Sequence, residues 1–201
     1  MSRAEQRDQT RRTLLQEGRK QFASAGYSAV GLAQIVSAVG VTKGAFYHHF
    51  QSKEDLFRAV LTEIQQEVAT RVAQVADAEP DPWDQLVAGC HAFLAASADP
   101  DVQQIMLIDA PAVLGWNEWR ALDEAASARH LTEALTHLMK VGVIATQPVE
   151  PLARLLSGAM NEAALWLAAT PDPTALATTK RALTTMLQAF RTTPPAAPST
   201  P

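Results

Sequence analysis

The chain has 201 residues, of which 47% are hydrophobic, and its formal net charge is −4. This length and apolar content suit one large or two small domains with a buried core. No apolar run is long enough to span a membrane and the N-terminal residues lack a signal-peptide pattern, so we expect a cytoplasmic protein that does not enter a membrane. The single cysteine, Cys90, excludes an internal disulfide, and its apolar neighbours favour a structural role over redox or metal chemistry.

Amphipathic segments separated by proline and glycine predict an all-α fold, because no segment has the alternating pattern of a β-strand. We expect about nine helices. One of them is a short helix within 42–50, and the others are predicted over 8–25, 32–39, 53–77, 82–97, 100–109, 116–141, 149–169 and 172–191. The predicted domains are an N-terminal one at 1–52 and a larger C-terminal one at 53–192. Residues 193–201 contain only Pro, Ala, Ser and Thr and are expected to form a disordered tail.

The segment around residues 32–50 has the pattern of a helix-turn-helix motif. Gly40 suits a tight turn between two short helices, and Thr42 can cap the second helix with its hydroxyl. The apolar residues of the two helices can share one small core, and they are Ile35, Val36, Val39, Val41, Phe46 and Phe50. Ser52, with Asp55 three residues later, predicts the capped start of the next helix.

The outward side of the second short helix carries residue types that suit contact with DNA. Lys43 offers a positive charge, Gly44 and Ala45 allow close approach, and Tyr47 offers a phenol for a phosphate or a ring for a thymine methyl. His48 and His49 complete this face. Any one of these residues is more often part of an ordinary solvated helix face, but the joint pattern favours DNA binding.

Charge is distributed unevenly along the chain. Residues 1–60 carry a net charge of +4, whereas the remaining residues carry −8. A basic head on an acidic body fits local DNA binding better than general adhesion to nucleic acid. Arg11 and Arg12, with Arg3 and Arg7, are candidates for phosphate or minor-groove contact from a mobile N-terminal arm. The alternative, an ordinary helix start of mixed charge, is equally compatible with Arg11 and Arg12.

Residues 11–60 resemble the DNA-binding domain of the TetR family of bacterial transcriptional regulators. The resemblance is carried by Phe22, Gly26-Tyr27, Ile35, Gly40-Val41-Thr42-Lys43-Gly44, Tyr47, His49-Phe50, Ser52-Lys53 and Leu56. It implies a homodimer that binds a palindromic double-stranded DNA operator, and represses a promoter until a small molecule enters the C-terminal domain. It implies DNA contacts at Thr42, Lys43, Gly44, Ala45, Tyr47, His48 and His49, with Lys53 on a phosphate. The chain departs from the family at Val30-Gly31, where a hydroxyl is common, and at Val36, where alanine is frequent.

Polar residues inside apolar segments are the candidates for an effector site. Asp109 interrupts the apolar run that includes Met106, just before the helix-ending Pro111. A buried carboxylate needs a partner, which could be a ligand or the free N–H groups of a following helix. Trp116 and Trp119 lie three residues apart and can line a pocket or pack in the core. Asn161 and Glu162 lie within another apolar helix, and together these residues suggest an uncharged or cationic organic effector.

The last two predicted helices are candidates for a dimer interface. Gly158, Ala159 and Ala163 permit close approach of a second copy of the helix at 149–169. The last helix adds apolar residues at three- and four-residue spacing, namely Leu183, Met186, Leu187 and Phe190. Two helices from each subunit then form a four-helix interface. We expect effector binding to shift the helix at 53–77 and so change the separation of the two heads.

Two other classes of function fit the sequence less well. An enzyme with a helical cavity is disfavoured because the chain has no Gly-rich phosphate loop, nucleophile motif or metal-ligand spacing. We therefore expect no catalytic residues, no metal and no cofactor. A nonspecific architectural DNA-binding protein is disfavoured by the acidic body, and a steep salt dependence without sequence preference would support it.

Overall fold

The computed structural model describes residues 2–125, 129–170 and 172–192, and within these ranges the chain is helical apart from turns and one isolated bridge between Ile144 and Arg191. The N-terminal elements are α1 (Arg3–Ala25), α2 (Leu32–Val39) and α3 (Lys43–Tyr47). They are followed by α4 (Lys53–Asp77), α5 (Pro82–Ser97), α6 (Pro100–Gln103), the π-helical segment η1 (Gln104–Asp109), α7 (Ala110–Leu114), α8 (Trp116–Asp123), α9 (Arg129–Lys140), α10 (Val149–Ala168) and α11 (Ala175–Gln188). The all-α prediction is confirmed, and the tail predicted at 193–201 lies outside the described residues.

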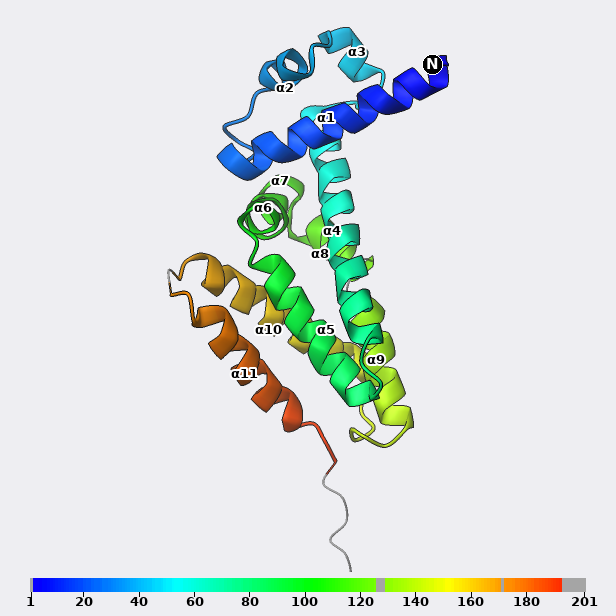
Figure 1. Ribbon diagram of the computed structural model, residues 1–201, viewed down its shortest axis with the longest axis vertical. Coiled ribbons are helices and arrows are strands. Elements are labelled where there is room, and N and C mark those ends of the chain that lie inside the picture. Colours follow the sequence, from blue (N-terminus) through cyan, green and yellow to red (C-terminus); the bar gives the residue numbers. More distant parts are fainter. Residues whose placement is uncertain (1, 126–128, 171, 193–201) are drawn as a thin grey trace, which may run out of the picture.

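Helices α1–α3 form a head at one end of an elongated molecule (Figure 1). The long helix α4 starts under the head and runs down the body beside α5, while α10 and α11 cover the opposite side of α5. We refer to α4–α11 as the body. Because α4 packs against α1 at its start and against α5 further along, one rigid helix connects the two parts.

Three aromatic rings fix the head to the start of α4. The rings of Phe22, Tyr27 and Phe57 lie with their centroids 5.0–5.6 Å apart, and the two pairs that include Phe57 meet edge to face. Phe22 and Phe57 are fully buried. Edge-to-face packing adds to the stabilisation that burial of such large apolar surfaces gives. The orientation of the head on α4 is therefore set by a packed core.

The helix ends follow from local sequence. Ser2 and Glu5 form a reciprocal capping box at the start of α1, so this helix begins five residues before the predicted start at residue 8. The predicted mobile arm is thus helical from Arg3 onward. Gly40 ends α2 in the left-handed conformation (φ 73°), as a tight turn requires. The Ser52 hydroxyl accepts from the amide of Asp55, which confirms the predicted cap of α4.

The segment around Pro111 differs from the prediction. The helix predicted over 100–109 continues through η1 and α7 and ends only at Gly115, whose φ is 79°. Proline has no N–H to bond the carbonyl four residues earlier, and here the chain widens into a π-helical turn and does not break. Helices α8 and α9 replace the single helix predicted over 116–141, and 126–128 between them lie outside the described residues.

Candidate nucleic-acid interface and ligand cavity

Helix α3 is positioned by its own cap and by its buried aromatic side chain. The Thr42 hydroxyl accepts a hydrogen bond from the amide of Ala45 at 3.1 Å, as predicted. Phe46 is fully buried, and its ring contacts Phe50 at a centroid distance of 5.7 Å. With this side of α3 anchored in the head, Tyr47 on the other side remains 56% exposed.

The exposed part of α3 holds most of the residues expected to face DNA. Thr42, Lys43, Gly44, Tyr47 and His48 are all exposed. This surface lies at the end of the molecule away from α10 and α11, where no part of the body covers it (Figure 1). A short helix carrying a cation, a glycine and an exposed phenol can approach a DNA groove closely.

Ala45 and His49 differ from their predicted outward orientation. Both are half-buried in a shallow groove between α3 and the first turns of α1. Burial lowers the pKa of His49, and the positive charge of Arg7 lowers it further. Its Nδ1 atom is buried and has no hydrogen-bond partner within the described part of the chain. These two residues therefore lie at the edge of the exposed α3 surface.

The basic residues of α1 and α4 have different environments. The Arg11 guanidinium stacks over the Phe50 ring at 5.1 Å, and Arg12 is exposed. The Lys53 ammonium donates to the carbonyls of Tyr27 (2.9 Å) and Val30 (2.8 Å), and it lies 3.8 Å from the Tyr27 ring centroid. Burial lowers the pKa of Lys53. Lys53 thus holds the turn after α1, which differs from the phosphate contact expected from the sequence.

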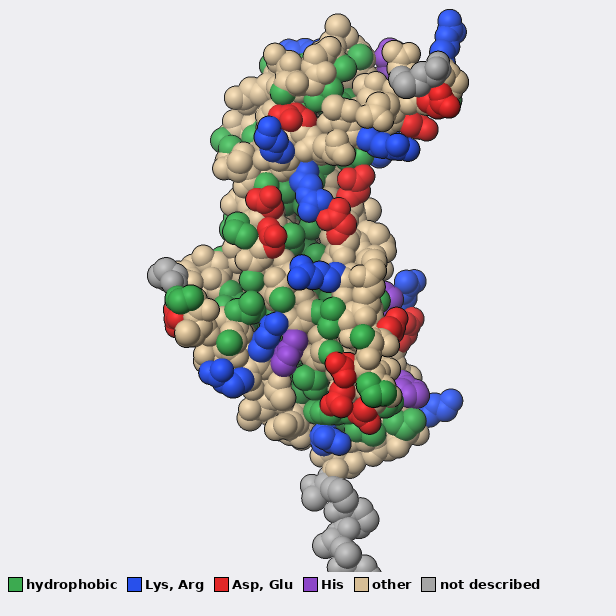
Figure 2. Space-filling view, viewed as in Figure 1, with side chains coloured by type: hydrophobic (Ala, Val, Ile, Leu, Met, Phe, Trp, Pro, Cys, Tyr) green, Lys and Arg blue, Asp and Glu red, His purple; other side chains and the backbone are tan. Residues whose placement is uncertain are grey.

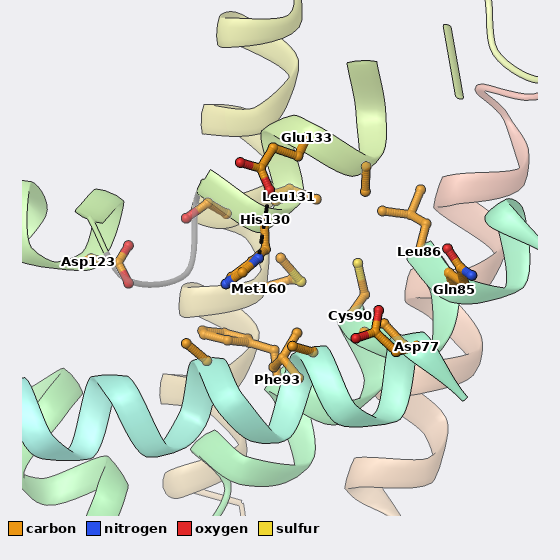
Figure 3. A pocket seen from close by; sticks show the side chains of 17 residues that line it. Asp77, Gln85, Leu86, Cys90, Phe93, Asp123, His130, Leu131, Glu133 and Met160 are labelled. Atoms are coloured by element: carbon orange, nitrogen blue, oxygen red, sulfur yellow. Dashed lines mark ion pairs between the residues drawn. The ribbon is translucent and has the colours of Figure 1, made fainter. Parts of the chain in front are cut away.

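The largest difference from the sequence prediction concerns the effector site. A cavity of about 280 Å³ lies between α4, α5, α8, α9 and α10, in the half of the body away from the head. Its apolar lining includes Val72, Leu86, Phe93, Leu131 and Met160 (Figure 3). A mostly apolar cavity with a few polar groups is the usual form of a small-molecule site.

None of the six predicted ligand residues lines this cavity. The Trp119 indole N–H donates to the Met106 carbonyl at 2.8 Å, and both side chains pack in the core. Trp116 is 63% exposed and Glu162 lies on the outside of α10. Asn161 is buried beside the cavity, although it does not line it.

Asp109 has a structural partner at the junction of head and body. One carboxylate oxygen accepts the backbone N–H of Tyr27 at 2.7 Å. The carboxylate lies close to Gly26, since a Cβ there would be 3.7 Å from one of its oxygens. Nearby, within the body, Arg58 on α4 and Glu118 on α8 form an ion pair with an N–O distance of 2.5 Å. The partner of Asp109 is therefore neither a ligand nor the start of the next helix, the two possibilities considered from the sequence.

Two of the carboxylates that line the cavity lie at its opposite sides. In Figure 3, Asp123 is on one side and Asp77 is on the other, with Phe93 and Met160 between them. Asp123 is buried, and burial raises the pKa of its carboxyl above the usual range, although Arg120, Asn161 and Ser157 oppose the shift. Asp77 is exposed, so we describe its side as the open side.

The α4 side of the cavity is formed mainly by alanines, a pattern from which the sequence analysis drew no prediction. Ala69, Val72, Ala73 and Ala76 recur with helical spacing and line the cavity, opposite Gly89 on α5. A Cβ at Gly89 would lie 3.6 Å from both Ala76 and Val72, so α4 and α5 approach closely there. The sequence predicts the effector site at polar residues within apolar runs. The predicted residues do not line the cavity, because a polar group inside an apolar helix can be buried to make a structural hydrogen bond as readily as to bind a ligand.

The only thiol of the chain provides a probe of the cavity. Cys90 lines it, and burial raises the pKa of this thiol to about 12. Because only the thiolate is nucleophilic, we expect native protein at pH 8 to react with Ellman's reagent at least about 100-fold more slowly than denatured protein. Equal rates measured by absorbance in buffer and in denaturant would contradict the buried position of Cys90.

The outer face of α10 carries apolar residues that the other described residues leave exposed. Leu155 is 73% exposed, Trp166 is half exposed, and Met186 on α11 is also exposed. A Cβ at Gly158 would meet nothing within 4 Å, so packing within the subunit does not require a glycine. By contrast, Leu183 and Leu187 are buried within the subunit, which corrects their predicted place on the outer side of α11.

Residues 2–125, 129–170 and 172–192 hold neither a metal-site cluster nor a membrane-spanning helix. In these ranges, no three or more His, Cys, Asp or Glu side chains are grouped so that they could hold a metal ion. No helix there has both the length and the apolar character needed to cross a membrane.

Family models match both parts of the chain. The model described as bacterial regulatory proteins, tetR family, matches residues 14–60, and the model described as tetracyclin repressor-like, C-terminal domain, matches residues 83–190. The second match alone covers more than half of the sequence. It includes most of the cavity lining, from Gln85 to Met160.

Individual proteins give the same picture. The chain is 25% identical to the transposon Tn10 TetC protein of Escherichia coli over 74% of its own length and 75% of that protein. It is 31% identical to the HTH-type transcriptional repressor Rv1474c of Mycobacterium tuberculosis, over 60% of this chain and 64% of that one. The crystal structure of a TetR-family transcriptional regulator from Pectobacterium atrosepticum superposes with a TM-score of 0.77 and 33% identity, covering 96% of this chain and all of the other.

Proposed function

Because the chain belongs to the TetR family of bacterial regulatory proteins, we propose that it represses transcription from a palindromic operator, and leaves that operator when a small organic molecule fills the cavity. It is a DNA-binding, ligand-responsive regulator, and regulators of this family act as dimers and are normally not enzymes. The observation that carries the proposal is the combination of an exposed α3 surface at one end with an apolar cavity in the other half.

The DNA-reading residues that we propose are those of the exposed α3 surface. Lys43 and Tyr47 supply the polar contacts, while Gly44 allows the helix backbone to approach the bases. Arg12 and His48 are further candidates for phosphates, since both are exposed on the head. Arg11 is a weaker candidate, because its guanidinium is stacked over Phe50.

We propose that the outer faces of α10 and α11 form the dimer interface. The exposed apolar side chains of Leu155, Trp166 and Met186 support this assignment, because monomers rarely leave such a surface open to water. Gly158 and Ala159 add a small-residue strip along which a second α10 can approach. Two heads held by this interface must meet half-sites about 34–36 Å apart or at a related spacing.

Two physical connections can carry the effect of a ligand to the head. The last turns of α4 line the cavity, and its first turns hold the aromatic core of the head. The second connection starts at Asp123 and continues through α8 to Trp119, which binds the Met106 carbonyl of η1; η1 ends at Asp109. Asp109 in turn accepts the Tyr27 N–H. A ligand that favours one arrangement of α4 and α8 thereby changes the orientation of the head.

The Asp109–Tyr27 hydrogen bond gives a test of the second connection. Asp109→Ala leaves the Tyr27 N–H without its partner, and we expect a loss of about 1–3 kcal/mol in the free energy of unfolding. Asp109→Asn keeps an oxygen acceptor of the same size, so it serves as the matched control and should lose less than half as much. Urea denaturation measures both. Equal losses in the two variants would contradict the assigned hydrogen bond.

The proposed function is tested by selecting binding sites from random duplex DNA with the purified protein. We expect an inverted repeat to be enriched, and a labelled copy of it to bind a dimer. Binding without any enriched sequence, together with a steep salt dependence, would instead indicate an architectural DNA-binding protein.

A further inference from the structure

The charge of the cavity lining limits the chemistry of its ligand. Asp77, Asp123 and Glu133 line the cavity, whereas no lysine or arginine is among its described lining residues. His130 also faces it, and its Nδ1 lies 3.9 Å from a Glu133 carboxylate oxygen (Figure 3). An organic anion would therefore lose its water beside carboxylates and gain no cation in return.

Among the described residues, Asp123 has one basic neighbour, at a long distance. Its basic neighbour, Arg120, lies 3.5 Å away, a long distance for an ion pair, and the same guanidinium is 3.6 Å from Glu124. Arg120 does not line the cavity. The side chains of Asn161 and Ser157 lie close enough to the Asp123 carboxylate to lower its pKa, although the contact of the Asn161 amide is not a hydrogen bond of good geometry. The buried side of the cavity thus holds a carboxylate that can accept further donors.

A ligand that fills the cavity needs a hydrogen-bond donor for the Asp123 carboxylate. An apolar ligand that displaces water would leave the buried Asp123 carboxylate with only the long Arg120 contact and the neighbouring Asn161 and Ser157 side chains, so part of its acceptor capacity would be lost at a cost. A protonated amine supplies both a positive charge and several N–H donors. The apolar side chains between Asp123 and Asp77, including Phe93 and Met160, suit a hydrocarbon or aromatic body attached to the amine.

Further acidic residues follow Asp77, which lines the open side of the cavity, in the sequence. Figure 2 shows acidic side chains gathered at the lower end of the body, where α4 ends and α5 begins. This part of the sequence contains Asp77, Glu79, Asp81 and Asp84. Such a surface raises the local concentration of cations.

We propose that the effector is a small organic amine whose cationic group binds Asp123 and whose apolar body fills the space between α4, α5, α9 and α10. This inference rests on the proposed ligand-released regulator and names its ligand class. The volume of about 280 Å³ suits a compact molecule such as an arylalkylamine.

Three probes of similar size and different charge test the proposal: 2-phenylethylamine, 2-phenylethanol and phenylacetate. Calorimetric titration of the full chain at pH 7 should give at least about 10-fold tighter binding of the amine than of the alcohol, and the weakest binding for the acid. Equal binding of amine and alcohol, stronger binding of the acid, or no binding of the amine up to about 10 mM would overturn the proposal.

Variants locate the charge that is recognised. Asp123→Asn should weaken the amine at least about 10-fold and change the alcohol less than about 3-fold, since it removes the charge and keeps the size. Glu63→Gln removes an exposed charge of α4 outside this cavity and should leave both unchanged. Asp77→Asn, at an exposed position, should weaken the amine by a smaller factor and remains informative if Asp123→Asn unfolds. An unaltered amine affinity in Asp123→Asn and Asp77→Asn would contradict the assignment.

The amine proposal and the proposed function fail in different ways. If the selected operator is bound and a neutral or anionic compound releases it, the amine proposal is wrong and the ligand-released regulator stands. If no sequence is selected, the regulator proposal itself is wrong, whatever binds in the cavity.

Discussion

The substitution Lys43→Ala or Tyr47→Ala is expected to remove most of the specific affinity for the operator. Each side chain is exposed on α3 and is not needed for the core of the head. A contact of this kind contributes about 1–3 kcal/mol, and a dimer carries it twice, so each substitution should weaken binding roughly 30-fold to 10⁴-fold. Fluorescence anisotropy with the selected operator measures the loss.

The two substitutions should differ in their dependence on salt. If Lys43 contacts a phosphate, its removal should lower the salt slope by about one unit per head, whereas Tyr47→Ala should leave the slope nearly unchanged. Lys140→Ala is the matched control, because Lys140 is exposed at the end of α9, far from α3 (Figure 1). If Lys140→Ala weakened the operator complex as much as Lys43→Ala, α3 would not be the reading surface.

Leu155→Asp is expected to convert the proposed dimer into monomers. Leu155 lies on the exposed apolar face of α10, so a two-fold interface would bury two new carboxylates without partners. We expect the dimer dissociation constant to rise at least about 100-fold, measured by analytical ultracentrifugation. The fold should remain, because Leu155 contributes little to the buried core.

Val75→Asp is the control for this substitution. Val75 is an exposed apolar residue of α4 and does not belong to the proposed interface. This variant should remain a dimer and keep its affinity for the operator. A monomeric Val75→Asp, or a dimeric Leu155→Asp with normal affinity, would exclude the outer face of α10 as the interface.

The head was predictable because its signals are local. Gly40, Thr42 and Ser52 each determine a turn or a helix end within a few residues, and the structure has these caps where the sequence predicts them. Lys53 differs, because its partners are two carbonyls more than twenty residues earlier, which no local pattern identifies.

The cavity could not be located from the sequence because its walls come from five helices that are distant along the chain. Asp109 and Asp123 have similar local settings, since each is an acid beside apolar helical residues. One binds the Tyr27 amide, 82 residues away, and the other lines the cavity. Only the packing of η1 and α8 against other helices distinguishes them, and packing depends on the whole fold.

The dependence of affinity on the spacing of the two half-sites tests the central claim most directly. A dimeric regulator must bind two half-sites on one side of the DNA. The measurement compares the selected inverted repeat with the same repeat carrying five extra base pairs at its centre, about half a turn of DNA. We predict that the insertion reduces affinity to that of a single half-site. Equal affinity for the two duplexes would contradict a dimer with two fixed reading heads.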